Sequence, residues 1–269
     1  MNFIVGFFSN LINETKELYR FRWVTISVVR STILLRYRRS LLGFFWSLLN
    51  PILNYIVVGM VFYLLNRGIT PNYFVYMFTG SAIFNLMSVS ANMSPHIMIG
   101  NEHYIKKIYL PKSIFVLNAV LLELVNFTFS LIALLLLGVL FGKITLSWAM
   151  LSLPFVIFFV VLFNFGFAAF ISVTSVFFRD LVHIIPILTQ ATFFATPILY
   201  TLELMPERFR EDMKLNPFFH IVKCFREPLY SGQLAGPINY AVLVLGSLFI
   251  FILGFWFLKR NENRIVFRL

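Results

Sequence analysis

The chain has 269 residues, of which 59% are hydrophobic and 12% are charged, and its mean hydropathy is +0.85. A soluble protein of this length carries less apolar surface, so the composition indicates an all-α integral membrane protein. The formal net charge is +11, but the basic residues lie between apolar runs and not on one soluble domain. Membrane orientation and anionic lipid headgroups explain this charge better than nucleic acid, which is not an expected partner.

Residues 1–34 are predicted to be a cytoplasmic region ahead of the first span. Within the first 20 residues apolar side chains recur at helical spacing, opposite polar ones. This pattern is typical of an amphipathic helix lying in the membrane interface. Packing of the same helix against the protein's own spans is an equally good interpretation, and the two are compatible. The apolar positions are Phe3, Ile4, Phe7, Phe8, Leu11, Ile12, Leu18 and Tyr19.

Six runs of about 20 apolar residues follow, each long enough for a helix to cross the hydrocarbon core. They predict a single transmembrane domain over 1–269, with spans 1–5 in 42–202, an external segment at 203–237, span 6 at 238–258 and a tail at 259–269. The predicted spans are Leu42–Leu65, Tyr73–Met93, Ile114–Phe141, Trp148–Phe178, His183–Leu202 and Ile238–Leu258.

Basic residues indicate the orientation of these spans. They gather before the first span, in the second-to-third connection and in the tail, whereas those of the fifth-to-sixth connection are matched by acids. The positive-inside rule therefore predicts that both termini lie in the cytoplasm.

The fifth span is interrupted by Pro186 and Pro197, with Thr189, Gln190, Thr192 and Thr196 between them. Proline frees backbone carbonyls that hydrocarbon cannot satisfy, so this segment is expected to face protein or a water-filled path. The external segment after it has apolar residues spaced as in two short helices at the outer interface, partly re-entrant. They form either an apolar lid over an exit or a membrane-surface anchor.

The sequence contains no recognisable motif for ATP binding, metal binding or catalysis. A phosphate-binding loop needs Gly-x-x-x-x-Gly-Lys-Ser/Thr, and the nearest match, Gly138 to Ile144, is one residue short and lacks the hydroxyl. The four histidines are scattered without metal-ligand spacing. We therefore expect no catalytic residue and no metal site, and a transport subunit instead of an enzyme; ATP, if it drives the protein, is bound by another chain.

A few polar side chains within the spans are candidates for a transport path. Glu123 in the third span either lines a polar path or pairs with a basic residue of a neighbouring helix. Gln190 and three tyrosines, Tyr55, Tyr63 and Tyr76, are further candidates, because a hydroxyl within a span needs a partner.

The basic cluster at Arg36, Arg38 and Arg39, with Tyr37 among them, precedes the first span. It anchors that span on the cytoplasmic side, and guanidinium groups could also capture a phosphate-bearing lipid headgroup there.

The second-to-third connection, 100–111, mixes exposed aromatic and charged residues before a proline. That composition suits either docking to a partner or a self-packed loop. Its candidate docking residues are Glu102, His103, Tyr104, Lys106 and Lys107, and Arg179 with Asp180 at the fourth-to-fifth turn is a second possible contact.

Several motifs resemble one family, the membrane subunits of type-2 ABC exporters of O-antigen, capsule or teichoic-acid polysaccharides. The most specific is Tyr-Arg-Arg-Ser-x-Leu-Gly-x-x-Trp-x-x-x-x-Pro at 37–51. Residues 101–111 are similar to the family's first coupling helix, and 178–181 to its second cytoplasmic contact. Thr196-Pro197-Ile198-Leu199-Tyr200 resembles Ser-Pro-Ile-x-Tyr of its fifth span, with Thr for Ser. Asn216-Pro217, with Arg226 and 229–232, resembles its external gate helices, which would include Pro217, Phe218, Phe219 and Arg226.

The resemblance implies a homodimer with two copies of a separate ATPase that binds ATP and Mg²⁺, in the cytoplasmic (inner) membrane of a bacterium. The implied cargo is a glycan on a polyprenyl pyrophosphate lipid, exported from the cytoplasm. Three alternatives remain at this point: a type-2 ABC permease for a lipid or drug, an integral-membrane enzyme of lipid-linked sugars, and a structural subunit.

Overall fold

The computed structural model describes residues 2–37, 71–140, 142–144, 146–202 and 205–269, together with the pairs 45–46, 49–50, 52–53, 56–57 and 60–61. Every regular element outside those short pairs is a helix. The predicted first span, Leu42–Leu65, lies mostly outside the described residues, and so do the predicted path residues Tyr55 and Tyr63.

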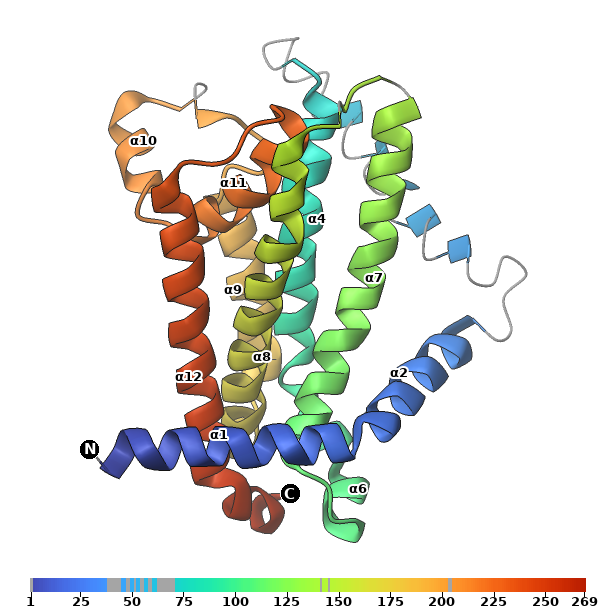
Figure 1. Cartoon of the computed structure of the whole chain (residues 1–269), viewed down its shortest axis with the longest axis vertical. Coiled ribbons are helices and arrows are strands. Elements are labelled where there is room, and N and C mark those ends of the chain that lie inside the picture. The colour runs from blue at the N-terminus through green and yellow to red at the C-terminus, as the bar shows by residue number, and fades with distance from the viewer. Residues whose placement is uncertain are drawn as a thin grey trace.

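Four helices in the described ranges are long and apolar enough to cross a membrane, and they run alongside one another in Figure 1. They are α4 (Tyr73–Met93), α7 (Lys112–Leu140), α8 (Leu153–Phe177) with the 3₁₀ turn η2 (Trp148–Ser152) before it, and α12 (Pro237–Arg268). They correspond to predicted spans 2, 3, 4 and 6. The membrane class of the fold is thereby confirmed.

The helix in the region of the predicted fifth span, His183–Leu202, ends earlier than that span. Helix α9 (Leu181–Ala195) has 15 residues, which at 1.5 Å per residue is about 22 Å and less than a hydrocarbon core of about 30 Å. The chain leaves the helix at Thr196–Tyr200, hereafter the broken segment, because Pro197 has no N–H to continue the helix and disfavours helical backbone before it.

Two short helices, α10 (Glu207–Met213) and α11 (Pro217–Tyr230), follow the broken segment at one end of the bundle (Figure 1). Helix α11 packs against α4, α8 and α12. Its side chains Val222, Cys224 and Phe225 are fully buried in the core. The apolar spacing that predicted a short helix therefore places α11 inside the bundle and not flat on its surface.

Among the described helices, α8 and α12 approach each other backbone to backbone. A Cβ atom at Gly254 of α12 would overlap the backbone oxygen of Gly166 on α8, and a Cβ at Gly166 would overlap the backbone of Ile250. Small residues that allow such backbone approach are the usual means by which helices associate in membranes. This contact fixes the frame on which the neighbouring helices are arranged.

Helix α12 continues to Arg268, well beyond the predicted end of the sixth span at Leu258. Polar side chains end a membrane span but do not end a helix, and Lys259 and Glu262 pair at i, i+3 along the extension.

The opposite end of the bundle carries the N-terminal helices and the C-terminus (Figure 1). Helix α1 (Asn2–Arg20) runs across this end, and Phe21 joins it to α2 (Arg22–Tyr37), which the sequence did not predict. Helices α5 (His96–Gly100) and α6 (Glu102–Lys107) form the connection between α4 and α7, and α6 also lies here. We call this the α1 end, and the other the α11 end.

Candidate functional site

The broken segment leaves four consecutive backbone carbonyls without helical partners, and side chains satisfy each of them. Arg226 on α11 donates to the oxygens of Pro197 (Nη1, 2.9 Å) and Ile198 (Nη2, 3.2 Å). On α4, the hydroxyl of Tyr73 donates to the oxygen of Leu199, and that of Tyr76 to the oxygen of Tyr200 at 3.2 Å. Non-helical backbone at membrane depth requires such partners, so these contacts explain how the predicted fifth span can be broken.

Arg226 is buried, with 7% of its surface exposed. Its guanidinium lies over the ring of Tyr76 at 3.7 Å from the centroid, a cation–π contact that gains strength away from water. Space for it comes from Gly80 on α4, where a Cβ would overlap Nη2 and lie 3.1 Å from Cζ. The Nε atom has no hydrogen-bond partner among the described residues.

Asn216 ties the start of α11 to the end of α9. Its Oδ1 accepts from the backbone N–H of Phe218 at 2.9 Å, an N-cap of α11, while its Nδ2 donates to the oxygen of Ala195 (3.2 Å) and to Oγ1 of Thr196 (3.1 Å). Asn216 and Arg226 thus hold the broken segment from both sides. Helix α11 and the end of α9 form one hydrogen-bonded unit.

Beneath α11 lies an apolar cavity of about 250 Å³ between α4, α8 and α9. Rings of Phe84, Phe163, Phe167 and Phe218 line it, together with the hydroxyls of Thr189 and Thr192 and five other side chains. Phe218, a predicted gate residue, packs edge-on against Phe84 and Phe163. The neighbouring gate residue Phe219 is buried, and Pro217 begins α11.

The predicted docking residues gather at the α1 end. Glu102 and Lys106 pair at 2.6 Å on the exposed surface of α6, and this hydrogen bond, with the charge of Lys106, lowers the pKa of Glu102. The charges of His103 and Arg179 lower it further, so Arg179 lies within electrostatic reach of α6. Arg179 and Asp180 are exposed in the turn between α8 and α9. The two segments predicted as partner contacts are therefore both exposed and within electrostatic reach of each other.

Other side chains on and next to α6 are also exposed to solvent. Tyr104 is exposed, as are His103, Lys106 and Lys107, and Tyr109 just after α6 has 75% of its surface exposed. Exposed tyrosines such as these are enriched in protein–protein contacts.

The remaining predicted residues are dispersed. Glu123 is buried on α7, and its Oε2 accepts a hydrogen bond from Asn126 one turn along at 3.1 Å. Gln190 is exposed on α9, and Tyr76 is committed to the broken segment. Arg36 and Tyr37 end the backbone of α2, but their side chains, like Arg38 and Arg39, lie outside the described residues.

Sequence reasoning missed three contributors, Tyr73, Gly80 and Asn164. Asn164 on α8 donates to the oxygen of Leu86 on α4 at 3.0 Å and is buried. A buried asparagine within an apolar run was the signal for this last contact. In the described residues no group of three His, Cys, Asp or Glu side chains is arranged to hold a metal ion.

Comparison with known proteins gives matches over most of the chain. Residues 24–230 match the sequence profile of the family described as ABC-2 type transporter. An O-antigen export system permease protein, RfbA, of Myxococcus xanthus is 30% identical over 226 residues, which cover 83% of this chain and 86% of that protein. The RfbA of Klebsiella pneumoniae is 28% identical, covering 89% and 92%. The polysialic acid transport protein KpsM of Escherichia coli is 20% identical, covering 86% and 90%.

Proposed function

This chain belongs to the ABC-2 type transporter family, and we propose that it is the membrane subunit of an ATP-driven exporter of polysaccharide. The observation that carries the proposal is its similarity, over most of both chains, to the O-antigen export permeases. The more distant similarity to a polysialic acid transport protein supports the same class of cargo.

In this proposal the chain crosses the cytoplasmic membrane of a bacterium six times, with both termini in the cytoplasm. The first span then lies between α2 and α4, and α9 together with the broken segment and α11 forms the fifth. The α1 end is cytoplasmic and the α11 end external. The basic residues of α6 and of the C-terminal part of α12 support this orientation.

A separate ATPase supplies the energy and binds ATP and Mg²⁺. We place its docking surface on α6 and the Arg179–Asp180 turn, because these segments are exposed, charged and within electrostatic reach of each other. Two copies of this chain and two of the ATPase make up the transporter. Closure of the ATPase pair around ATP would then displace both α6 helices.

The cargo is a glycan on a polyprenyl pyrophosphate lipid, whose phosphates the arginines at 36, 38 and 39, with Tyr37, would recognise. Helix α9 supports a path between the two copies, because Gln190 and several apolar side chains of this short helix are exposed in the single chain. Helix α11 serves as an external gate. The hydrogen bonds of Asn216 and Arg226 make it move together with the end of α9.

The test is purification of the tagged chain from its native membrane in mild detergent, followed by mass spectrometry of the proteins that accompany it. We expect an ATPase with a phosphate-binding loop in equal amount, and stimulation of its hydrolysis by lipid-linked polysaccharide extracted from the same cells. Stimulation by a lipid or drug instead would assign a different cargo. Repeated isolation of the intact chain without an ATPase would refute the proposal.

A further inference from the structure

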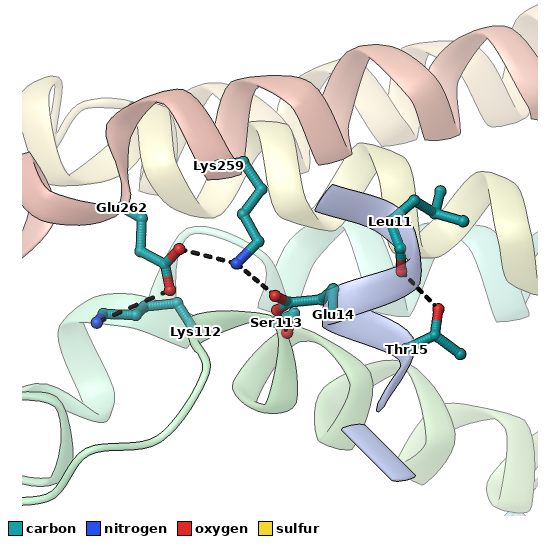
Figure 2. A network of polar contacts seen from close by, with 7 residues as sticks. All are labelled: Leu11, Glu14, Thr15, Lys112, Ser113, Lys259 and Glu262. Carbon is teal, nitrogen blue, oxygen red and sulfur yellow. Dashed lines mark hydrogen bonds and ion pairs between the residues drawn. The ribbon is translucent and has the colours of Figure 1, made fainter. Parts of the chain in front are cut away.

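The N-terminal helix is attached to the bundle by a buried carboxylate. Glu14 lies in the middle of α1 with 3% of its surface exposed. Its carboxylate accepts a hydrogen bond from Oγ of Ser113 on α7 and forms an ion pair with Nζ of Lys259 on α12 (Figure 2). One side chain of α1 therefore contacts two different spans.

The contacts continue into a network of four charges. Nζ of Lys259 lies 2.9 Å from Oε2 of Glu262, and Oε1 of Glu262 lies 3.9 Å from Nζ of Lys112 (Figure 2). Acids and bases alternate along this four-charge network, so that its formal charge is zero. It joins α1, the first two residues of α7 and the end of α12.

Apolar contacts also hold α1 against the bundle. Leu11 packs against a buried apolar cluster that includes residues of α7, α8 and α12, and Leu18 borders an apolar cavity of about 270 Å³ formed with the same helices. Burying a carboxylate is costly even when it is paired, and apolar side chains often replace buried ion pairs without loss of stability. Charged and hydrogen-bonded pairs additionally fix the positions of the helices that they join relative to one another.

The network lies directly beside the predicted ATPase contact. Lys112 and Ser113 begin α7, and only four residues separate Lys112 from the end of α6 at Lys107. Helix α1, on the other side of the network, continues through Phe21 into α2 and so toward the predicted first span. The hydrogen bond from Ser113 to Glu14 therefore connects the start of α7, next to α6, directly with α1.

We propose that Glu14 and Ser113 act as a joint that transmits displacement of α6 to α1 and α2, with Lys259 holding the Glu14 carboxylate in place. The inference rests on the proposed function, in which an ATPase docks on α6. Glu14 and Ser113 are positioning residues in this scheme and contact neither ATP nor cargo. The N-terminal helix is then a moving part of the transporter and not a passive membrane anchor.

The variant Ser113→Ala separates these two roles. It removes the link between α1 and α7 but leaves the Glu14–Lys259 ion pair, so that α1 stays attached to α12. Its matched control is Thr15→Ala, which removes a hydroxyl of the adjacent residue that bonds only within α1, to the oxygen of Leu11 at 2.7 Å (Figure 2). Glu14→Gln, Lys259→Gln and their combination form a second, independent series.

The readout is an environment-sensitive fluorophore on a cysteine introduced at the exposed Asn13 of α1, in the complex with its ATPase; the native Cys224 is buried. We expect ATP to change the emission, and Ser113→Ala to reduce that change at least about fivefold while ATPase binding is unchanged. Thr15→Ala should behave as the parent. In the second series, the double variant should reduce the ATP-dependent change in emission no more than the more impaired of the two single variants does.

An unchanged signal in Ser113→Ala, or no ATP-dependent signal in a parent complex that hydrolyses ATP, would overturn the inference and leave the proposed function intact. Failure of any ATPase to associate with the parent chain would instead overturn the proposed function.

Discussion

Substitution of Gly80 by alanine should destabilise the unit formed by α11 and the broken segment. The added Cβ would overlap Nη2 of Arg226, so the guanidinium must move and its bond to the oxygen of Ile198 is lost. A hydrogen bond to a charged group contributes about 1.5–3 kcal/mol, whereas alanine in place of glycine within a helix gains about 0.5–1 kcal/mol. The expected net loss is therefore about 1–2 kcal/mol.

The control is Gly246→Ala on α12, because among the described residues no side chain and no other segment lies within 4 Å of the position that its Cβ would occupy. That variant should be neutral or more stable by up to about 1 kcal/mol. Both are measured as the midpoint of thermal unfolding of the detergent-solubilised protein. Gly80→Ala should lower the midpoint, whereas Gly246→Ala should raise it or leave it unchanged.

A double-mutant cycle tests the cause of the loss. If the methyl group acts by displacing Arg226, Gly80→Ala should cost nothing further in an Arg226→Met background. The reasoning is refuted if Gly80→Ala matches Gly246→Ala, or if its cost is the same with and without Arg226.

Three further sets of substitutions test other parts of the structure. Reversing the charge of Lys106 and Lys107 to glutamate should weaken ATPase co-purification by about tenfold or more, with unchanged membrane insertion; unchanged association would remove α6 from the docking surface. Gly254→Ala should force α8 and α12 apart and lower the unfolding midpoint, at a cost of about 1–3 kcal/mol, where Gly246→Ala does not. Asn216→Ala should cost about 2 kcal/mol, and Asn216→Asp about half of that, since aspartate keeps the N-cap but cannot donate to α9; equal costs would exclude the link to α9.

The long apolar helices could be predicted from sequence because hydropathy and helix length act locally. The range predicted for α4, Tyr73–Met93, is the range observed. The ends of the helices were less predictable, because the end of a membrane span and the end of a helix have separate physical causes. The end of a membrane span is set by polarity, but α12 continues as a helix past it, and α9 stops early because of Pro197 while the surroundings remain apolar.

The unit at the α11 end was only partly predictable. Proline in an apolar run indicated freed carbonyls, and the resemblance to a known family pointed to Asn216 and Arg226. The partners of those carbonyls on α4 could not be found from sequence, because Tyr73 and its acceptor Leu199 are 126 residues apart. Nor does the sequence show that Gly80 provides the space for a guanidinium, which depends on how α4 and α11 pack.

The Glu14 contacts were beyond prediction for a related reason. The sequence placed Glu14 on the polar face of an amphipathic helix, where a solvated carboxylate is expected. Its partners Ser113 and Lys259 lie far along the chain, and only the crossing of α1 beneath α7 and α12 brings them together. Both interpretations of α1 that the sequence left open have support: Leu11 packs against buried residues of the spans, while Ile12 and Tyr19 remain exposed.

The two ends of the bundle use different chemistry, and this difference has consequences for motion. At the α11 end a buried cation faces carbonyl dipoles with little access to water, so that breaking its bonds leaves a buried guanidinium and buried carbonyls with fewer partners than they need. At the α1 end Lys112, Lys259 and Glu262 keep 14–24% of their side-chain surface exposed, so that water can replace a partner that moves away. The α11 unit is therefore suited to move as a rigid body, and the four-charge network to rearrange during a transport cycle.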